Sequence, residues 1–254
     1  MTVDTTHALA LAKRAARDAV LRLKTLLDKE VVIDSDSARD VKLAADRESE
    51  RTILQILRSG SDWPVLSEES GWSGDSRAPV RWIVDPLDGS MNYLRRIPFC
   101  CVSIALWQDD EPLLGVIHDI DRDEIFSGVV GDGAWFNEAP MHVSAATRSD
   151  SAVLCMGFPL STDFSPEALG RYIEHIRGYK KIRFLGSAAL SLAYVGAGRT
   201  DAYYERDIKL WDIAAGLAIV SAAGGVVVKR PTTIEAAYDV AAAASASVLP
   251  GVAR

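Results

Sequence analysis

The chain has 254 residues, of which 48% are hydrophobic and 25% are charged, and its formal net charge is -7. This composition is typical of a globular enzyme, and an acidic balance without a basic block argues against nucleic-acid binding. The length allows one large domain or two closely packed ones.

Targeting and redox features are also informative. No apolar run is long enough to span a bilayer, and basic residues at positions 13, 14 and 17 interrupt the first apolar stretch, so we expect no membrane association and no signal peptide. The three cysteines, Cys100, Cys101 and Cys155, lack the spacing of a disulfide framework or a metal site. We therefore expect buried free thiols and a cytoplasmic protein.

The chain begins with a helical pattern. Apolar residues at helical spacing predict helices over residues 7–28 and 46–58, the second ending at Gly60. Between them, residues 30–45 are polar and predict a hairpin or a loop. Residues 64–69 predict a short strand that ends in acidic side chains.

Strands follow in the next part of the chain. Residues 71–79 are rich in Gly and Ser and predict a surface loop. An apolar strand over residues 82–84 is expected to stop at Asp85, because Pro86 cannot donate to a strand ladder. Apolar, β-branched segments separated by short turns then predict an antiparallel meander. These segments cover residues 99–107, 113–118 and 124–130.

The second half of the chain alternates strands and helices. The predicted strands cover residues 152–156, 182–185, 201–205 and 226–229. The predicted helices cover residues 165–177, 187–197 and 211–223. The last twenty-odd residues are rich in Ala and predict no clear element. Residues 1–147 are thus expected to form an α+β half and residues 148–254 an α/β half, with no linker that would separate them.

The turn after the strand at residues 82–84 carries the most informative chemistry. Asp85 and Asp88 place two carboxylates at one strand end, followed directly by Gly89 and Ser90. Carboxylate oxygens suit Mg²⁺, and backbone N–H groups after the turn could bind a phosphate. The alternative is an ordinary turn, since Asp, Pro and Gly are common turn formers.

Three further acidic positions occur at the ends of predicted elements. Glu68, followed by Glu69, ends a strand, and alone it could be a solvated loop acid. Asp46 and Asp212 stand at helix starts, where an N-cap role would explain each one. Taken together, four element ends that each carry an acid predict a carboxylate cluster. Such a cluster repels itself unless a cation is bound.

Several of these segments, in this order, resemble the inositol monophosphatase family over roughly residues 7 to 230. The segments are Ser67-Glu68-Glu69-Ser70, Trp82-Ile83-Val84-Asp85-Pro86-Leu87-Asp88-Gly89-Ser90, Gly186-Ser187-Ala188-Ala189, Asp201-Ala202-Tyr203-Tyr204-Glu205 and Trp211-Asp212-Ile213-Ala214-Ala215-Gly216. The sequence has Ser90 where Thr is usual in the family, which keeps the hydroxyl and loses a methyl group.

The resemblance implies roles for particular residues. The implied Mg²⁺ ligands are the side chains of Glu68, Asp85, Asp88 and Asp212 and the carbonyl oxygen of Leu87. The implied catalytic residues, which would polarise the attacking water, are Asp46 and Glu68, with Ser90 as a relay. The implied substrate contacts are Asp88, Gly89, Ser90, Gly186, Ser187, Ala188, Glu205 and Asp212. Among them, Gly89 and Ser90 would bind phosphate oxygens, and Glu205 would accept hydrogen bonds from substrate hydroxyls.

The resemblance also implies an activity and a fold. The expected activity is Mg²⁺-dependent hydrolysis of a small sugar or cyclitol phosphate monoester, with inositol-1-phosphate as the leading substrate. The alternatives are fructose-1,6-bisphosphatase, histidinol-phosphate phosphatase or nucleotide phosphatase activity, and a non-catalytic binding protein with the same fold. The expected fold is α/β, a layered αβαβα sandwich of the sugar phosphatase type. The resemblance also implies that the protein forms a homodimer. The expected binding partner is a small-molecule phosphate monoester.

Overall fold

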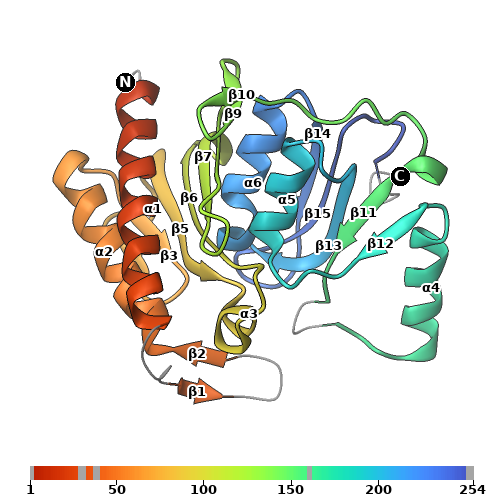
Figure 1. The fold of residues 1–254 in the computed structure, drawn as a ribbon, viewed down its shortest axis with the longest axis horizontal. Coiled ribbons are helices and arrows are strands. Elements are labelled where there is room, and N and C mark those ends of the chain that lie inside the picture. Colours follow the sequence, from red (N-terminus) through yellow and green to blue (C-terminus); the bar gives the residue numbers. More distant parts are fainter. Residues whose placement is uncertain (1–2, 28–32, 37–40, 159–161, 250–254) are drawn as a thin grey trace.

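Helices and sheets alternate through the molecule in five layers (Figure 1). Helices α1 (Thr5–Leu27) and α2 (Ala44–Gly60) cover the outer face of an eight-stranded sheet. Helices α5 (Ala188–Gly196) and α6 (Leu210–Ala222) lie between this sheet and a five-stranded one. Helix α4 (Pro166–Ile176) flanks the far side of the second sheet. The predicted αβαβα sandwich is confirmed.

The structure, a computed structural model, describes residues 3–27, 33–36, 41–158 and 162–249. The described part also contains the short helix α3 (Ser90–Arg95) and the 3-10 helix η1 (Ser149–Ser151). The strands are β1 (Ile33–Asp36), β2 (Val41–Leu43), β3 (Val65–Ser67), β4 (Gly71–Ser73), β5 (Val80–Asp88), β6 (Cys101–Gln108), β7 (Glu111–Asp119), β8 (Ile125–Val129), β9 (Gly133–Phe136), β10 (Ala139–Pro140), β11 (Val153–Met156), β12 (Lys181–Arg183), β13 (Ala202–Lys209), β14 (Val226–Pro231) and β15 (Ala237–Ala243).

The eight-stranded sheet has the strand order β10-β9-β8-β7-β6-β5-β3-β4. Strands β5 to β9 pair antiparallel in chain order, which confirms the predicted meander, whereas β3 lies parallel to β5. The five-stranded sheet has the order β12-β11-β13-β15-β14. Strands β1 and β2 pair antiparallel outside both sheets, as the hairpin interpretation requires, although residues 28–32 and 37–40 lie outside the described part.

Helix α6 is apolar on nearly all sides because both of its faces are covered by sheets. Two glycines allow the close packing. A Cβ atom on Gly115 of β7 would lie 2.2 Å from the carbonyl oxygen of Ala215, and one on Gly216 would lie 2.4 Å from Cβ of Leu192 in α5. The middle of α6 therefore packs closely against both β7 and α5, where no larger side chain would fit.

Strand β5 corrects the expectation that Pro86 ends the strand. The strand runs through Pro86 to Asp88. Asp85 pairs with Ser103 and Asp88 pairs with Cys101, so the β5 side has one more residue than the β6 side between these pairs. This bulge accommodates Pro86 without a ladder hydrogen bond from its nitrogen. It also turns the end of β5, with its two aspartates, out of the regular pleat.

Four strands were not predicted from the sequence. Residues 71–79 were expected to form a loop, but β4 begins there, and β9 and β10 extend the meander. The Ala-rich C-terminal region contains β15, which lies between β13 and β14. Alanine has a low strand preference, and a strand covered on both faces shows no alternation of polar and apolar residues. The period-2 signal is therefore missing in β15.

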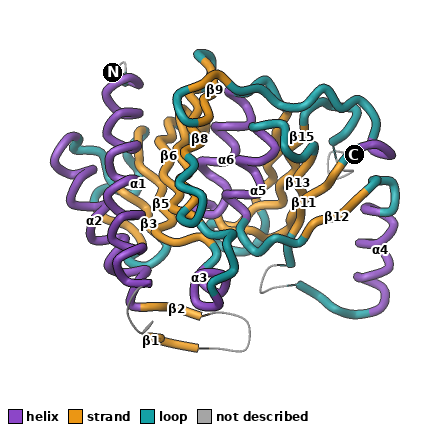
Figure 2. Tube along the Cα trace, viewed as in Figure 1, coloured by secondary structure: helices purple, strands orange, loops and turns teal. Residues whose placement is uncertain are grey.

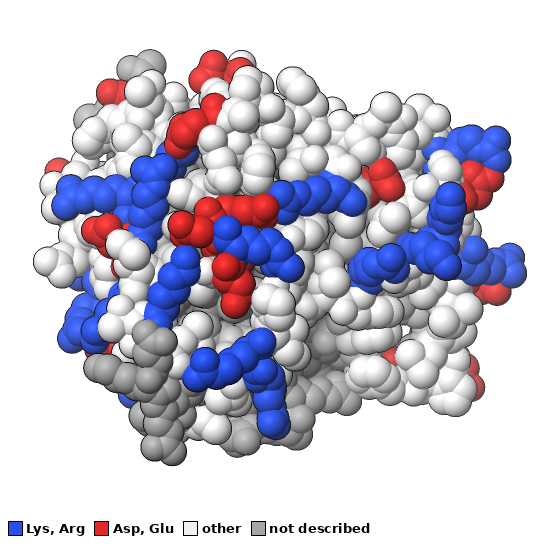
Figure 3. Space-filling view, viewed as in Figure 1, with Lys and Arg blue, Asp and Glu red and all other residues white. Residues whose placement is uncertain are grey.

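Other expectations from composition can be compared with the structure. All three cysteines are buried free thiols, as predicted. Among the described residues, no helix combines the length and the apolar character needed to cross a bilayer. On the face drawn in Figure 3, basic and acidic side chains are interspersed. Ion pairs of the protein include Lys24 with Asp123 and Arg199 with Glu124.

Candidate active site

Three acidic side chains from distant parts of the chain meet at one edge of the sandwich. Glu68 follows the end of β3, Asp85 lies at the bulge of β5, and Asp212 lies in the first turn of α6. One carboxylate oxygen from each residue lies within 4.8 Å of the others. β3 and β5 are parallel neighbours, and the Glu68 N–H donates to the Val84 carbonyl oxygen at 3.2 Å, which sets the first two acids side by side.

This arrangement fits a hard divalent cation. Oxygen ligands bound to one Mg²⁺ lie about 2.1 Å from the ion and therefore roughly 3 to 4 Å from one another. The three carboxylates already approach that spacing. No sulfur or imidazole belongs to the group, and an all-oxygen set favours Mg²⁺, Mn²⁺ or Ca²⁺ over softer metals.

The electrostatics of the cluster also indicate a cation. Burial raises the pKa of the Asp85 carboxyl well above its ordinary value, and the neighbouring Glu68, Asp88 and Asp212 raise it further. Burial and Glu68 likewise raise the pKa of Asp212. Carboxylates crowded in this way either bind protons or gain from a positive ion between them.

Asp88 occupies a different position from the three-acid group. Its Oδ2 accepts a hydrogen bond from Ser187 Oγ at 2.5 Å and another from the Ala189 N–H at 2.7 Å, so one oxygen is bound to the first turn of α5. Burial raises the pKa of Asp88 to about 6, and the two hydrogen bonds oppose this rise. Asp88 therefore joins the end of β5 in the first half to α5 in the second half.

Asp46 and Ser90 form a linked pair beside this turn. The Ser90 hydroxyl lies 3.1 Å from Asp46 Oδ1 and 3.0 Å from the Leu87 carbonyl oxygen, and it can donate to either. The other oxygen of Asp46 accepts from the Leu43 N–H at 2.6 Å. The predicted water-orienting acid and its relay are thus in contact. The Leu87 carbonyl, a predicted metal ligand, lies in the same network.

The N-cap interpretation of the two helix-start acids is wrong. Leu43 is the N-cap of α2, and Asp46 is the third residue of the helix, from which its side chain reaches back to the cap. Lys209 is the N-cap of α6, and Asp212 is the third residue of that helix. Both carboxylates therefore lie inside the first helical turn, where the helix dipole favours negative charge.

Two glycine turns bring the end of β5 and the segment before α5 close together. Gly89 has φ of +92° and Gly186 has φ of +82°, a region that glycine enters without strain. A Cβ on Gly89 would lie 3.2 Å from the Gly186 carbonyl oxygen. The buried Asn92 side chain fixes this approach, because its Nδ2 donates to the carbonyl oxygens of Phe99 and Leu185, both at 2.8 Å.

A cavity of about 240 Å³ opens beside the acids. It is lined by Asp88, Met156, Gly157, Phe158, Gly186, Ser187, Ala188, Ser191, Tyr203, Glu205, Ile208 and Asp212. The predicted contacts Gly186, Ser187, Ala188 and Glu205 therefore share one cavity with Asp88 and Asp212. Gly89 and Ser90 lie next to it, at the turn between β5 and α3.

Glu205 is a second buried carboxylate of this cavity, beside Asp88. Only 6% of the residue is exposed, and burial raises its pKa to about 7. The Tyr203 hydroxyl donates to Glu205 Oε2 at 2.6 Å and opposes that rise. A Cβ on Gly157 would lie 2.5 Å from Oε2 of Glu205, so any larger residue at position 157 would displace the carboxylate.

Sequence reasoning missed three residues that shape the site. Asn92 lies two residues after the quoted motif that ends at Ser90, and no sequence pattern indicates its two carbonyl partners. Tyr203 lies two residues before Glu205 in β13, so both side chains point to the same face of the strand, and this period-2 relation is the signal that could have identified it. Gly157 carried no local signal, because its role arises only from the packing of β11 beside β13.

Comparisons with known proteins agree with this geometry. The model of the "Inositol monophosphatase family" matches residues 4–251. A "Nus factor SuhB" from Xylella fastidiosa is 41% identical over 224 residues, covering 85% of this chain and 78% of that protein. An "Inositol-1-monophosphatase" from Synechocystis is 37% identical over 227 residues, covering 86% and 77%.

Solved structures point the same way. The inositol monophosphatase from Anabaena superposes with a TM-score of 0.84 at 33% identity, covering 97% of this chain and 93% of that one. The extragenic suppressor protein suhB from Bartonella henselae superposes with a TM-score of 0.83 at 33% identity, covering 95% of each chain. Because the family model matches nearly the whole chain, and relatives and solved structures at 33% to 41% identity cover most of it, this chain belongs to the inositol monophosphatase family.

Proposed function

We propose that this protein is a Mg²⁺-dependent phosphatase that hydrolyses a small polyol phosphate, with inositol-1-phosphate as the leading substrate. Membership of the family supports phosphatase activity in general. The observation that carries the finer proposal is the shared cavity, in which Asp88 and Asp212 face a space of about 240 Å³ that also contains the buried carboxylate of Glu205. Such a space suits one small ring with several hydroxyl groups.

The acidic residues are proposed to have two roles, metal binding and orientation of the attacking water. Glu68, Asp85 and Asp212 would hold Mg²⁺, together with Asp88 and the Leu87 carbonyl oxygen. The bound ion would neutralise the phosphate and activate a water molecule for attack. Asp46, through the Ser90 hydroxyl, would orient that water, since these two groups already lie 3.1 Å apart.

Phosphate and alcohol would be bound by different turns. The N–H groups of Gly89 and Ser90 would donate to phosphate oxygens, which is compatible with the open backbone of Gly89 at positive φ. On the alcohol side, the carboxylate of Glu205 would accept hydrogen bonds from substrate hydroxyls, while Tyr203 holds it in place. Gly186, Ser187 and Ala188 would form the adjoining wall.

The halves at residues 1–147 and 148–254 are proposed to act as one unit rather than as separate domains. The connection from β10 to β11 crosses between the two sheets as a loop with one 3-10 turn (Figure 2). Helix α6, from the second half, packs on the sheet of the first half, and the proposed ligands come from both. Neither half would contain a complete site.

We further propose a homodimer, which the exposed aromatic surface beside the site supports. Phe158, Phe164 and Phe184 are 42%, 46% and 52% exposed, and the rings of Phe158 and Phe184 stack with centroids 5.1 Å apart. Contiguous exposed apolar side chains mark interaction surfaces. Sedimentation velocity of the wild type and of Phe184→Glu tests this, and a monomeric wild type contradicts it.

The proposed activity is tested by phosphate release from inositol-1-phosphate with Mg²⁺ and with EDTA. Fructose-1,6-bisphosphate, histidinol phosphate and a nucleoside monophosphate serve as competing substrates. We expect turnover that requires Mg²⁺ and a kcat/KM that is highest for the inositol ester. The alternative of a non-catalytic binding protein would be supported by Mg²⁺ binding without release of phosphate from any of the four substrates.

A further inference from the structure

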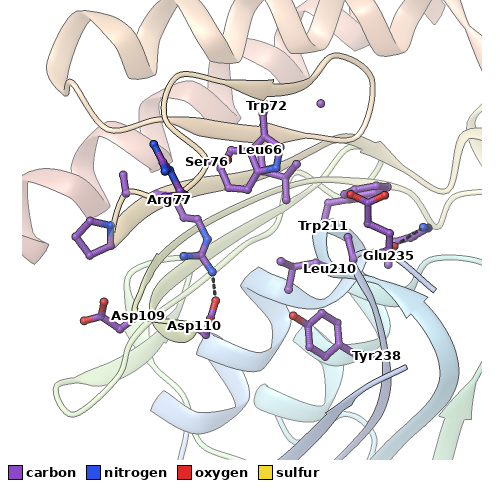
Figure 4. A pocket seen from close by; sticks show the side chains of 16 residues that line it. Leu66, Trp72, Ser76, Arg77, Asp109, Asp110, Leu210, Trp211, Glu235 and Tyr238 are labelled. Atoms are coloured by element: carbon purple, nitrogen blue, oxygen red, sulfur yellow. Dashed lines mark hydrogen bonds and ion pairs between the residues drawn. The ribbon is translucent and has the colours of Figure 1, made fainter. Parts of the chain in front are cut away.

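A second cavity, larger than the proposed substrate pocket, lies where β4, the start of β5, the β6–β7 turn and the first residues of α6 and β15 meet (Figure 4). Its volume is about 630 Å³, within the range of small-molecule sites. None of its lining residues belongs to the lining of the 240 Å³ cavity. The proposed hydrolysis uses no group in it.

Three aromatic side chains, each from a different element, line its walls. Trp72 comes from β4, Trp211 from α6 and Tyr238 from β15, with Leu66 and Leu210 between them (Figure 4). None of the three rings stacks on another of the three, in contrast to the paired rings elsewhere in the described part of the chain. Trp72 is 42% exposed and is therefore accessible to a ligand.

The charged residues of the cavity are balanced and partly paired. Arg77, Arg81 and Lys209 face Asp109, Asp110 and Glu235 around the wall. Arg81 forms an ion pair with Asp110, and Lys209 Nζ donates to the Glu235 carbonyl oxygen at 2.8 Å. A wall with equal numbers of both signs has little preference for an anion. The cavity therefore does not have the character of a second phosphate site.

We propose that this cavity is a binding site for an uncharged small molecule with a planar aromatic ring, of a size between indole and a purine nucleoside. Such a ring would stack on the indole of Trp72, beside the indole of Trp211, whose ring already has the Lys209 ammonium 5.7 Å from its centroid. Polar groups for the edge of the ring are offered by two lining residues, Ser76 and Tyr238, and the Tyr238 hydroxyl has no hydrogen-bond partner among the described residues.

The experiment is a saturation-transfer NMR titration of the full-length protein in EDTA, with adenosine as probe. Ribose is the matched control, because it carries the same sugar without the ring. We expect adenosine to bind with saturation transferred mainly to its ring protons, and ribose not to bind. Trp72→Ala should weaken adenosine binding by roughly tenfold or more, whereas Trp72→Phe, which keeps a ring, should weaken it much less.

Three results would overturn the proposal: no adenosine binding at millimolar concentration, binding that is equal in the wild type and Trp72→Ala, or displacement of adenosine by inositol-1-phosphate, which would place it in the 240 Å³ cavity. If Trp72→Ala does not fold, Tyr238→Leu removes a different ring at similar volume. Its adenosine binding should also fall, and unchanged binding by this variant would count against the site.

Discussion

Replacing Glu205 with Gln should make the protein more stable at pH 8 while impairing its proposed activity. Burial raises the pKa of Glu205 from 4.5 to about 7, so folding at pH 8 includes the free energy of keeping this buried group ionised. A difference of about 2.5 pKa units corresponds to about 3 kcal/mol. Gln has no charge to desolvate, and its carbonyl oxygen can still accept from Tyr203.

The sign of the pH dependence follows from the direction of the shift. A carboxyl whose folded pKa is raised lowers stability above that pKa, and this penalty disappears below the unfolded pKa. The stability difference between Glu205→Gln and the wild type should therefore be near zero at pH 4.5. It should grow through the window up to about pH 7 and reach its full value near pH 8.

The assay is urea unfolding in EDTA at pH 4.5, 6 and 8, with Glu167→Gln as the control for loss of one acidic charge. Glu167 is exposed in the first turn of α4, so its substitution should change stability by no more than about 0.5 kcal/mol at any of these pH values. The reasoning is refuted if Glu205→Gln is less stable than the wild type at pH 8, or if its advantage does not depend on pH.

Further outcomes follow from the same geometry. Asp85→Asn should lower kcat/KM for inositol-1-phosphate by roughly 100-fold or more, since replacing a residue that only hydrogen-bonds to a metal ligand already lowers metal affinity or activity about 10- to 100-fold. Near-normal turnover of the folded variant would contradict the ligand assignment. Asp88→Asn should melt at a higher temperature than the wild type in EDTA, and added Mg²⁺ should raise its melting temperature less. The reason is that Asn keeps the acceptor for Ser187 without the charge. Equal Mg²⁺-induced shifts of the melting temperature in calorimetry would count against this prediction. Asn92→Ala should raise KM by roughly tenfold, because the Gly186 turn would be misplaced. The control is Asn137→Ala, which removes a hydrogen bond to β8 and should reduce stability while leaving KM unchanged. The same KM in both variants would show that Asn92 does not belong to the site.

Much of this fold could be predicted because its elements carry local signals. The helices over residues 7–28 and 46–58 show helical spacing and appear as α1 and α2 with ends shifted by two residues or fewer. The meander shows β-branched segments with short turns. Strand β15 has no such signal, because its alanines do not alternate with polar residues. They are buried because β15 lies between β13 and β14 and is covered by both neighbouring layers.

The extension of β5 depended on tertiary structure. Pro86 should end a regular strand, but the bulge opposite β6 lets the ladder resume at Asp88. Whether a bulge forms is decided by the register with a strand that lies more than ten residues away. The same bulge lets Asp85 join the acid cluster while Asp88 meets α5.

The candidate site likewise contains residues whose positions were predictable from the sequence and residues whose positions were not. The approach of Glu68, Asp85 and Asp212 was predictable, because acids at several element ends are destabilising unless they serve a cation. The positions of Asn92 and Gly157 were not, since each acts through a partner distant in the sequence. Asn92 contacts Leu185, and Gly157 leaves room for Glu205.

The central claim is that Glu68, Asp85 and Asp212 hold the divalent cation on which hydrolysis depends. Its most direct test is anomalous diffraction from crystals soaked in Mn²⁺, which takes the same oxygen ligands as Mg²⁺ and scatters anomalously. The account predicts a strong peak within about 2.5 Å of one oxygen from each of the three carboxylates. Ordered crystals with no peak between these residues, or with the ion bound elsewhere in the protein, would contradict it.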